Sequence, residues 1–155
     1  FGSNATFSST NTIGTFLNGE YLTSYVDSSY SAMIEDSTIW YLGTVGSGTS
    51  YKLAKYVDIN MSSTTTSTAS AKVGLLRMGE LMSGQFDRSG NNTYYWTLTP
   101  NSSSYVRFVG SYGNAGNGSP SVAFGVRPSV NLKSNVQIVN GDGTLNSPFE
   151  LQLGS

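Results

Sequence analysis

The stretch TYYWTLT (Thr93–Thr99) decides the fold class of this chain, together with YVRFV (Tyr105–Val109) shortly after it. The first is aromatic and β-branched, and the second alternates in polarity, as a half-buried strand does. Alternation returns in Ser121–Leu132 and in Val136–Val139, and Gly141–Gly143 has the composition of a tight turn. The second half of the chain is therefore predicted to be mainly antiparallel β-structure.

The N-terminal part has helical spacing instead. Thr10–Asn18 is predicted to be a helix that Thr10 or Asn11 caps and that Asn18-Gly19 ends in a left-handed conformation. A second short helix is predicted to begin at Asp27. The apolar residues at helical spacing are Ile13, Phe16 and Leu17 in the first helix, and Tyr30, Met33 and Ile34 in the second.

Short elements and loops are predicted between these two regions. They are a strand at Ser37–Leu42, a glycine-rich turn at Gly43–Ser50, a strand at Tyr51–Ile59, an exposed Ser/Thr loop at Met61–Ala71, a strand at Lys72–Leu76 and one or two helical turns at Met78–Met82. Helices early and strands late predict an α+β fold, with short N-terminal helices and a twisted, mainly antiparallel sheet. The 155 residues suit a single domain, 1–155.

Composition excludes several classes of function. The chain has no His and no Cys, which removes Ser-His-Asp and Cys-His catalysis and any zinc site built on imidazole or thiolate. A net charge of −1 supplies no field for nucleic acid. No apolar run approaches the roughly 20 residues of a membrane-spanning helix. Only 11% of residues are charged, and Ser, Thr, Asn and Tyr take their place, which favours a bacterial extracellular protein.

A series of motifs resembles a family of uncharacterised bacterial surface domains. The motifs are TFLNGEYL (Thr15–Leu22), AKVGLLRMGELM (Ala71–Met82), YYWTLTP (Tyr94–Pro100), VRFVGSYGNAG (Val106–Gly116), GVRPSVNLKS (Gly125–Ser134) and GDGTLNSPFEL (Gly141–Leu151). The family shares a leucine-asparagine helix end, a WTLTP-like strand, a GVRP-x-x-NL strand and a closing GDGT hairpin. Its members often look like the globular heads of pilin-like proteins, so the resemblance implies a location at the cell surface or in a pilus.

That resemblance carries further expectations. The family looks like the C-type lectin fold in its formylglycine-generating-enzyme-like variant, in which Gly125-Val126-Arg127 would take the place of a GFR-type strand. Proteins diversified by retroelements use this fold and place their variable residues just upstream of that strand. The chain begins at Phe1 rather than Met, so an upstream stalk or pilin helix is expected, and it would be the route of any membrane attachment.

The segment Asn101–Ser121 is the candidate binding surface. Tyr gives rigid contact area with a polar tip, and Ser, Asn and Gly give adaptable hydrogen bonds, as in antibody paratopes. The alternative is a solvated loop that joins two strands. The candidate ligand-binding residues are the anchors Tyr105, Arg107, Phe108 and Tyr112, and the adaptable positions Asn101, Ser103, Ser104, Ser111, Asn114, Asn117, Ser119 and Ser121.

Strand alternation divides the anchors between two faces. Tyr105, Arg107 and Val109 share one face, and Val106 and Phe108 share the other. Both faces cannot serve a ligand equally. We expect Arg107 to contact the ligand. The sequence leaves open whether Phe108 contacts the ligand or belongs to the core.

Other conspicuous residues have structural interpretations. Arg127 lies in an apolar run, which predicts an ion pair with Glu80 or another carboxylate rather than a ligand contact. Trp40 and Trp96 have apolar strand neighbours and are predicted to be core residues. Asn140–Gly143 is predicted to be a hairpin turn.

Calcium and catalysis are the rival uses of the carboxylates. Glu35-Asp36 and Asn140-Gly141-Asp142 are the candidate calcium ligands, and neither forms a converging acidic loop, so no metal and no cofactor is predicted. The pairs Glu35/Asp36 and Glu80/Asp87 could in principle hydrolyse a glycan. Neither pair lies in a recognisable catalytic motif, and no catalytic residue is assigned.

The resulting prediction is a non-catalytic, extracellular ligand-binding domain of adhesin or receptor type, at the head of a pilin-like protein. Its partner would be a protein or a glycan on another cell, a phage or a host. Two alternatives stay open: a structural pilin or fibre subunit that contacts only other subunits, and a glycan-active hydrolase that uses a carboxylate pair.

Overall fold

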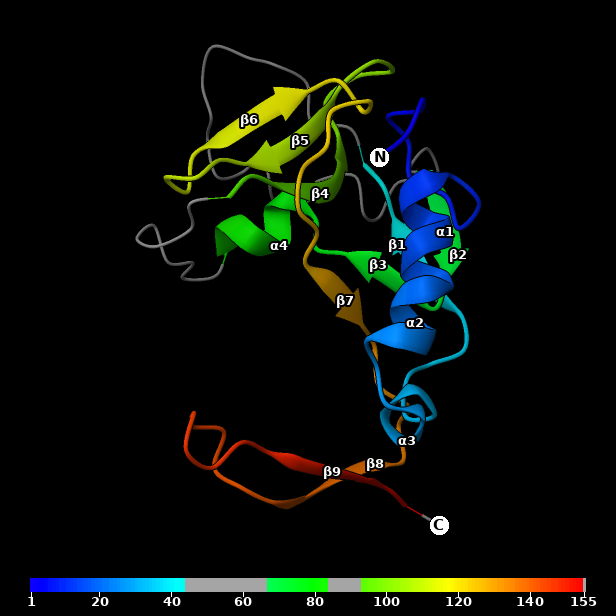
Figure 1. Cartoon of the computed structure of the whole chain (residues 1–155), viewed down its shortest axis with the longest axis vertical. Coiled ribbons are helices and arrows are strands. Elements are labelled where there is room, and N and C mark those ends of the chain that lie inside the picture. Colours follow the sequence, from blue (N-terminus) through cyan, green and yellow to red (C-terminus); the bar gives the residue numbers. More distant parts are fainter. Residues whose placement is uncertain (44–66, 84–92, 155) are drawn as a thin grey trace.

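The computed structural model describes residues 1–43, 67–83 and 93–154. Short helices come first and strands dominate afterwards (Figure 1). The helices are α1 (Thr12–Asn18), α2 (Glu20–Ser24), α3 (Ser28–Ser31) and α4 (Met78–Ser83). The strands are β1 (Thr38–Tyr41), β2 (Thr68–Ala71), β3 (Val73–Leu75), β4 (Tyr95–Pro100), β5 (Val106–Val109), β6 (Ala115–Gly118), β7 (Pro128–Val130), β8 (Val136–Asn140) and β9 (Glu150–Leu153).

The described strands form four small antiparallel sheets. Their orders are β1-β2, β3-β7, β4-β5-β6 and β8-β9. A parallel bridge between Tyr95 and Gly125 ties the segment before β7 to β4. The predicted mixture of helices with mainly antiparallel strands is therefore confirmed, although the strands do not make one continuous sheet in this part of the chain.

Helix α1 begins as predicted and ends differently. The side chain of Asn11 accepts a hydrogen bond from the N–H of Gly14 at 2.9 Å, so Asn11 is the N-cap. Gly19 has φ of −123°, which is not the left-handed conformation that was expected. The helix instead turns directly into α2, which the sequence patterns did not predict.

The side chain of Asn18 joins the end of α1 to β3. Its Oδ1 accepts from the N–H of Val73 at 2.8 Å, and its Nδ2 donates to the carbonyl of Val73 at 3.0 Å. The same Nδ2 donates to the carbonyl of Gly14 at 3.0 Å. One amide thus satisfies both main-chain groups of a buried strand residue.

Asp27 caps α3 as predicted, because its side chain accepts from the N–H of Ser29 at 2.9 Å. The helix is only one turn long. Met33 and Ile34 lie beyond its end and are buried, whereas Tyr30 is exposed, so the expected apolar helix face does not form. Ile34 instead forms an antiparallel bridge with Leu132.

The Ser/Thr-rich segment predicted as a loop is partly a strand. Residues 68–71 form β2, which pairs with β1 in the register Thr38 to Ala71. The backbone of β2 pairs with β1, while most of its small polar side chains stay exposed. Pairing with a neighbouring strand therefore makes this segment a strand although its sequence has no apolar strand pattern. The predicted strand at 51–59 and the rest of the predicted loop, 61–66, lie outside the described residues.

The predicted strand at 121–132 is mostly irregular. Only 128–130 is a strand, β7, and it pairs with β3. Segment 119–126 instead crosses one face of the β4-β5-β6 sheet, where the Phe124 ring lies 4.6 Å from the Trp96 ring and 4.9 Å from the Phe108 ring. Apart from the bridge at Gly125, close aromatic packing takes the place of strand pairing in this segment.

The core lies on both sides of the β4-β5-β6 sheet. One buried cluster joins the N-terminal segment, α1 and β1 to β3, β4 and β5, and it includes Trp40 and Trp96 as predicted. On the other face, α4 packs against the sheet through Met78, with Tyr95 and Val109. Both faces of this sheet are therefore covered.

The β8-β9 hairpin projects away from the three-stranded sheet, at the opposite end of the molecule (Figure 1). Its turn is the predicted one: Gly141 and Gly143 have φ of 87° and 81°, and Asp142 Oδ1 accepts from the N–H of Thr144 at 2.9 Å. Several apolar side chains remain exposed along it, among them Leu145 at 97%. In the described ranges, every helix is too short to cross a membrane.

Candidate functional site

The segment predicted to bind a ligand is divided between exposed and buried side chains. The exposed candidates are Ser103, Ser104, Tyr105, Tyr112, Asn114, Asn117 and Ser121; the half-buried ones are Phe108, Ser111 and Ser119; the buried ones are Asn101 and Arg107. The exposed candidates lie mainly in the two turns that flank β5 and in the segment after β6. The strand interiors contribute little to the accessible surface.

Arg107, the preferred ligand contact, is fully buried at 0% exposure. The predicted alternation is correct, because β5 pairs Arg107 with Asn117 and Phe108 with Gly116 across to β6. Val109, which shares a face of β5 with Arg107, packs with Met78 of α4. The expectation that Arg107 is open to a ligand is therefore wrong.

Phe108 belongs to an aromatic cluster on the opposite face of the sheet. Its ring is T-shaped to the rings of Tyr94 at 5.5 Å and Trp96 at 6.1 Å. Gly116 makes room for it, since a Cβ there would lie 2.4 Å from the end of the Phe108 ring. Phe108 is thus the core residue that the sequence had left open, and it is half-buried.

The first turn holds Tyr105 at the surface. The carbonyl of Tyr105 accepts from the N–H groups of Asn101 at 2.8 Å and of Ser102 at 3.2 Å. Asn101 itself is buried at 7% exposure, so it supports the turn rather than facing solvent as expected. Tyr105 remains 46% exposed. The turn is hydrogen-bonded and presents its aromatic ring outward.

The second turn holds Tyr112. The N–H of Gly110 donates to the carbonyl of Asn114 at 2.7 Å, and the N–H of Gly113 donates to the carbonyl of Gly110 at 2.9 Å. Gly113 has φ of 73°, a conformation that favours glycine. Tyr112 is 78% exposed. Because four strand residues separate the two turns, the tyrosines lie at opposite ends of β5.

Arg127 lies at the surface, and its predicted ion pair with a carboxylate stays a prediction. It is exposed, and its Cζ lies 4.1 Å from the centroid of the Tyr95 ring. Glu80, its expected partner, forms an ion pair with Arg77 at 2.9 Å. An exposed guanidinium over an aromatic face does not incur the burial cost that motivated the prediction.

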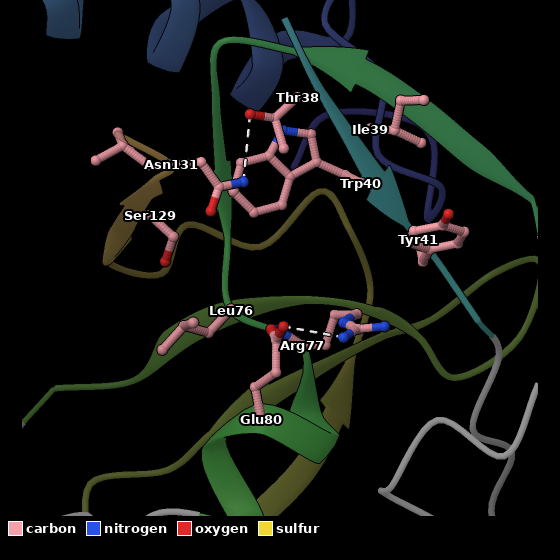
Figure 2. A pocket seen from close by; sticks show the side chains of 10 residues that line it. Thr38, Ile39, Trp40, Tyr41, Leu76, Arg77, Glu80, Ser129 and Asn131 are labelled. Carbon is pink, nitrogen blue, oxygen red and sulfur yellow. Dashed lines mark hydrogen bonds and ion pairs between the residues drawn. The ribbon is translucent and has the colours of Figure 1, made fainter. Parts of the chain in front are cut away.

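A separate cavity of about 160 Å³, with both polar and apolar walls, opens between β1, the end of β7 and the start of α4 (Figure 2). At one end the Asn131 Nδ2 donates to the Thr38 Oγ1 at 3.3 Å. At the other end the Arg77 Nη2 donates to the Glu80 Oε1 at 2.9 Å. The side chain of Tyr41 also lines the cavity, so hydrogen-bonding groups and an aromatic ring surround one small space.

Sequence reasoning did not find this cavity, because its walls come from three distant segments. The one available signal was the spacing of Arg77 and Glu80, which is three residues. In the structure Glu80 also accepts from the N–H of Arg77, through Oε2 at 2.8 Å, and so anchors the first turn of α4. The ion pair positions the guanidinium at the cavity wall.

The other carboxylates of the described residues do not converge on this cavity. Asp36 is held by Lys72 at 3.2 Å and by Lys133 at 3.5 Å, and the hydrogen bond from Lys72 is the main reason that the pKa of Asp36 is below its usual value. Of the described residues that line the cavity, Glu80 alone carries a carboxylate. Glycoside hydrolysis needs a pair of carboxylates. Asp87, the other member of the predicted pair, lies outside the described residues.

Comparison with known proteins assigns no relatives to this chain. No family model, no curated protein and no solved structure matches it.

Proposed function

We propose that the chain is an extracellular, non-catalytic recognition domain that contacts a protein or glycan through the two turns at the ends of β5. The observation that carries this proposal is the exposure of Tyr105, at 46%, and of Tyr112, at 78%, on hydrogen-bonded turns. The strands between them are packed on both faces. Contact residues can therefore change without disturbing the core.

The chemistry of these turns suits recognition. A Tyr side chain provides a large contact area and loses little conformational entropy on binding, and neighbouring Ser and Asn side chains can adjust their hydrogen bonds. The turns are closed by main-chain hydrogen bonds, which reduces the ordering that binding requires. With few charged residues, association would depend weakly on salt.

The finer identity of the domain belongs to the same proposal. The motifs quoted above suggest a C-type-lectin-like fold at the head of a pilin-like surface protein, forming a single domain. The position of the exposed turns, upstream of Gly125-Val126-Arg127, agrees with a surface diversified by a retroelement. Related genes in one genome should then differ mainly at the exposed positions of 101–121, and Arg107 and Asn101 should stay constant because they are buried.

The experiment compares two double variants on an array of immobilised glycans and on a panel of bacterial and host cells. Tyr105→Ala/Tyr112→Ala should lose at least tenfold in binding and keep the wild-type melting temperature. Tyr25→Ala/Tyr30→Ala is the matched control, because those tyrosines are 67% and 52% exposed outside the two turns. Equal binding by both variants and the wild type would refute the proposal.

A structural role as a fibre subunit is the second candidate, and the β8-β9 hairpin favours it. Ile138, Leu145 and Phe149 are 60%, 97% and 52% exposed on a hairpin that projects from the sheets. Exposed apolar side chains of this kind are typical of surfaces that contact another subunit. Sedimentation velocity tests it: self-association that Leu145→Ser/Phe149→Ser abolishes would support subunit contacts, and a monomer at all concentrations would contradict them.

A further inference from the structure

The cavity beside Arg77 and Glu80 is separate from the proposed recognition surface, since none of its described lining residues belongs to the two turns around β5. Its volume is about 160 Å³. A cavity of about 150 Å³ in another protein holds one benzene molecule, so this cavity has room for a single six-membered ring. Ile39 and Asn131 line it and are exposed, so the cavity is open and substituents of the ring can extend into solvent.

Three polar groups of the cavity wall are available to a ligand. Asn131 Nδ2 donates to Thr38 Oγ1 at 3.3 Å, which leaves Asn131 Oδ1 as an acceptor and the Thr38 hydroxyl proton as a donor. Within the described ranges, neither of these groups has another protein partner, and the Ser129 hydroxyl has none. Figure 2 shows the side chains of Asn131 and Ser129 on one side of the cavity and that of Glu80 on the opposite side.

The surrounding structure holds this wall in place. The carbonyl of Asn131 accepts from the N–H of Glu35 at 2.8 Å, and Ser129 lies opposite Gly74 in the β3-β7 ladder. A Cβ at Gly74 would lie 2.6 Å from the Trp40 ring, so the indole packs directly against β3. Because these residues are fixed before a ligand enters, binding requires little additional ordering.

The charges of the wall cancel each other. Among the described lining residues, Arg77 and Glu80 are the charged ones, and their Nη2 and Oε1 atoms are 2.9 Å apart. A charged ligand would therefore meet no unpaired opposite charge. Leu76 and Tyr41, each 39% exposed, lie on opposite sides of the cavity in Figure 2 and provide apolar contact area. The wall thus suits a neutral molecule that has hydroxyl groups on a saturated ring.

We propose that this cavity binds one neutral pyranose ring, either a free monosaccharide or the last residue of a glycan. One ring hydroxyl would donate to Asn131 Oδ1, and neighbouring hydroxyls, which can each donate and accept, would bond to Ser129 and Thr38. The C–H groups of the ring would contact Leu76 and Tyr41. This site goes beyond the recognition proposed for the turns and does not rest on it.

The probes are glucose, galactose, mannose, rhamnose and N-acetylglucosamine, each as the free sugar and as its methyl glycosides. In a ¹⁵N–¹H spectrum, at least one of them should shift the side-chain amide signals of Asn131 and the indole signal of Trp40 in a saturable way. Trp96 does not line the cavity, so its indole signal is the internal reference. Binding of both forms of a sugar would indicate the last residue of a glycan, and binding of the free sugar alone would indicate a free monosaccharide.

Variants locate the bound sugar. Asn131→Ala removes the acceptor at an exposed position and should weaken binding about fivefold to tenfold. Asn135→Ala is the matched control, because it removes an exposed amide outside the cavity, and it should leave the affinity unchanged. Tyr105→Ala/Tyr112→Ala should also leave it unchanged. If Asn131→Ala fails to fold, Ser129→Ala gives the same test, with the same expected loss.

Three results would overturn the proposal. The first is the absence of a saturable shift with every probe up to its solubility limit, which would leave recognition through the turns unaffected. The second is equal affinity of a bound sugar for the wild type and for folded Asn131→Ala and Ser129→Ala variants. The third is loss of sugar binding in Tyr105→Ala/Tyr112→Ala, because the sugar would then bind at the turns.

Discussion

Replacing Asn18 by Ala tests the contact that joins the helical part of the chain to its strands. The Asn18 side chain accepts from the N–H of Val73 at 2.8 Å and donates to the carbonyl of the same residue at 3.0 Å. Val73 is 0% exposed, so water cannot readily replace the lost partners. Asn18→Ala therefore leaves one buried donor and one buried acceptor of the main chain without a hydrogen bond.

The expected loss in the free energy of unfolding follows from the cost of leaving the N–H and the carbonyl of Val73 without hydrogen bonds. Leaving a buried donor or acceptor unsatisfied costs about 1–3 kcal/mol. Asn18 itself is only half-buried, so some water will reach the gap, and we expect the lower half of the sum, about 2–4 kcal/mol in the free energy of unfolding. For a chain of this size that corresponds to a fall of roughly 5–15 °C in melting temperature.

Urea unfolding followed by tryptophan fluorescence measures this change. The midpoint should fall while the dependence of the free energy on urea stays the same. Asn135→Ala is the matched control, because its amide donates to the carbonyl of Gly154 at 3.0 Å in an exposed position, and it should cost less than about 1 kcal/mol. Equal midpoints for Asn18→Ala and Asn135→Ala would refute the reasoning.

Three further predictions concern other parts of the molecule. Arg107→Ala should lower the free energy of unfolding by about 3 kcal/mol, because the side chain is fully buried, and thermal unfolding will show it; an unchanged melting temperature would mean that Arg107 is accessible after all. The pKa of Asp36 is lowered, chiefly by the hydrogen bond from Lys72, so its stabilising contribution is present above the ordinary value of 3.8 and is lost as the pH falls through the lowered pKa. The difference in melting temperature between the wild type and Asp36→Asn should accordingly shrink below about pH 4, and a difference that stays constant with pH would contradict this. Amide hydrogens of β8 and β9 should exchange faster than those of β4 and β5, because the two-stranded hairpin has largely exposed side chains; equal protection in hydrogen exchange would contradict that expectation.

Local features were predictable from the sequence. Asn11 and Asp27 cap their helices because each cap is a hydrogen bond to an N–H two or three residues away. The turn at 141–143 follows equally from its two glycines and one Asp. The division of Arg107 and Phe108 between opposite faces also follows from alternation alone.

Features that depend on distant pairing were not predictable. Ala115–Gly118 has no strand-like composition, and it is a strand because it pairs with β5, where its glycines admit the rings of Phe108 and Trp96. Residues 68–71 become a strand by pairing with β1. The intrinsic preference of such segments is weak, so the neighbouring strand decides their conformation.

The sequence by itself determined the α+β class, the absence of histidine and thiol chemistry, and the presence of tyrosines in the turns around β5. Only the tertiary structure decided that both faces of that strand were covered, and it buried Arg107 while leaving Tyr105 and Tyr112 exposed. The cavity beside Arg77 and Glu80 likewise arises only in three dimensions, because its walls come from segments dozens of residues apart. Alternation tells which side chains share a face, whereas packing between distant elements determines whether that face meets water.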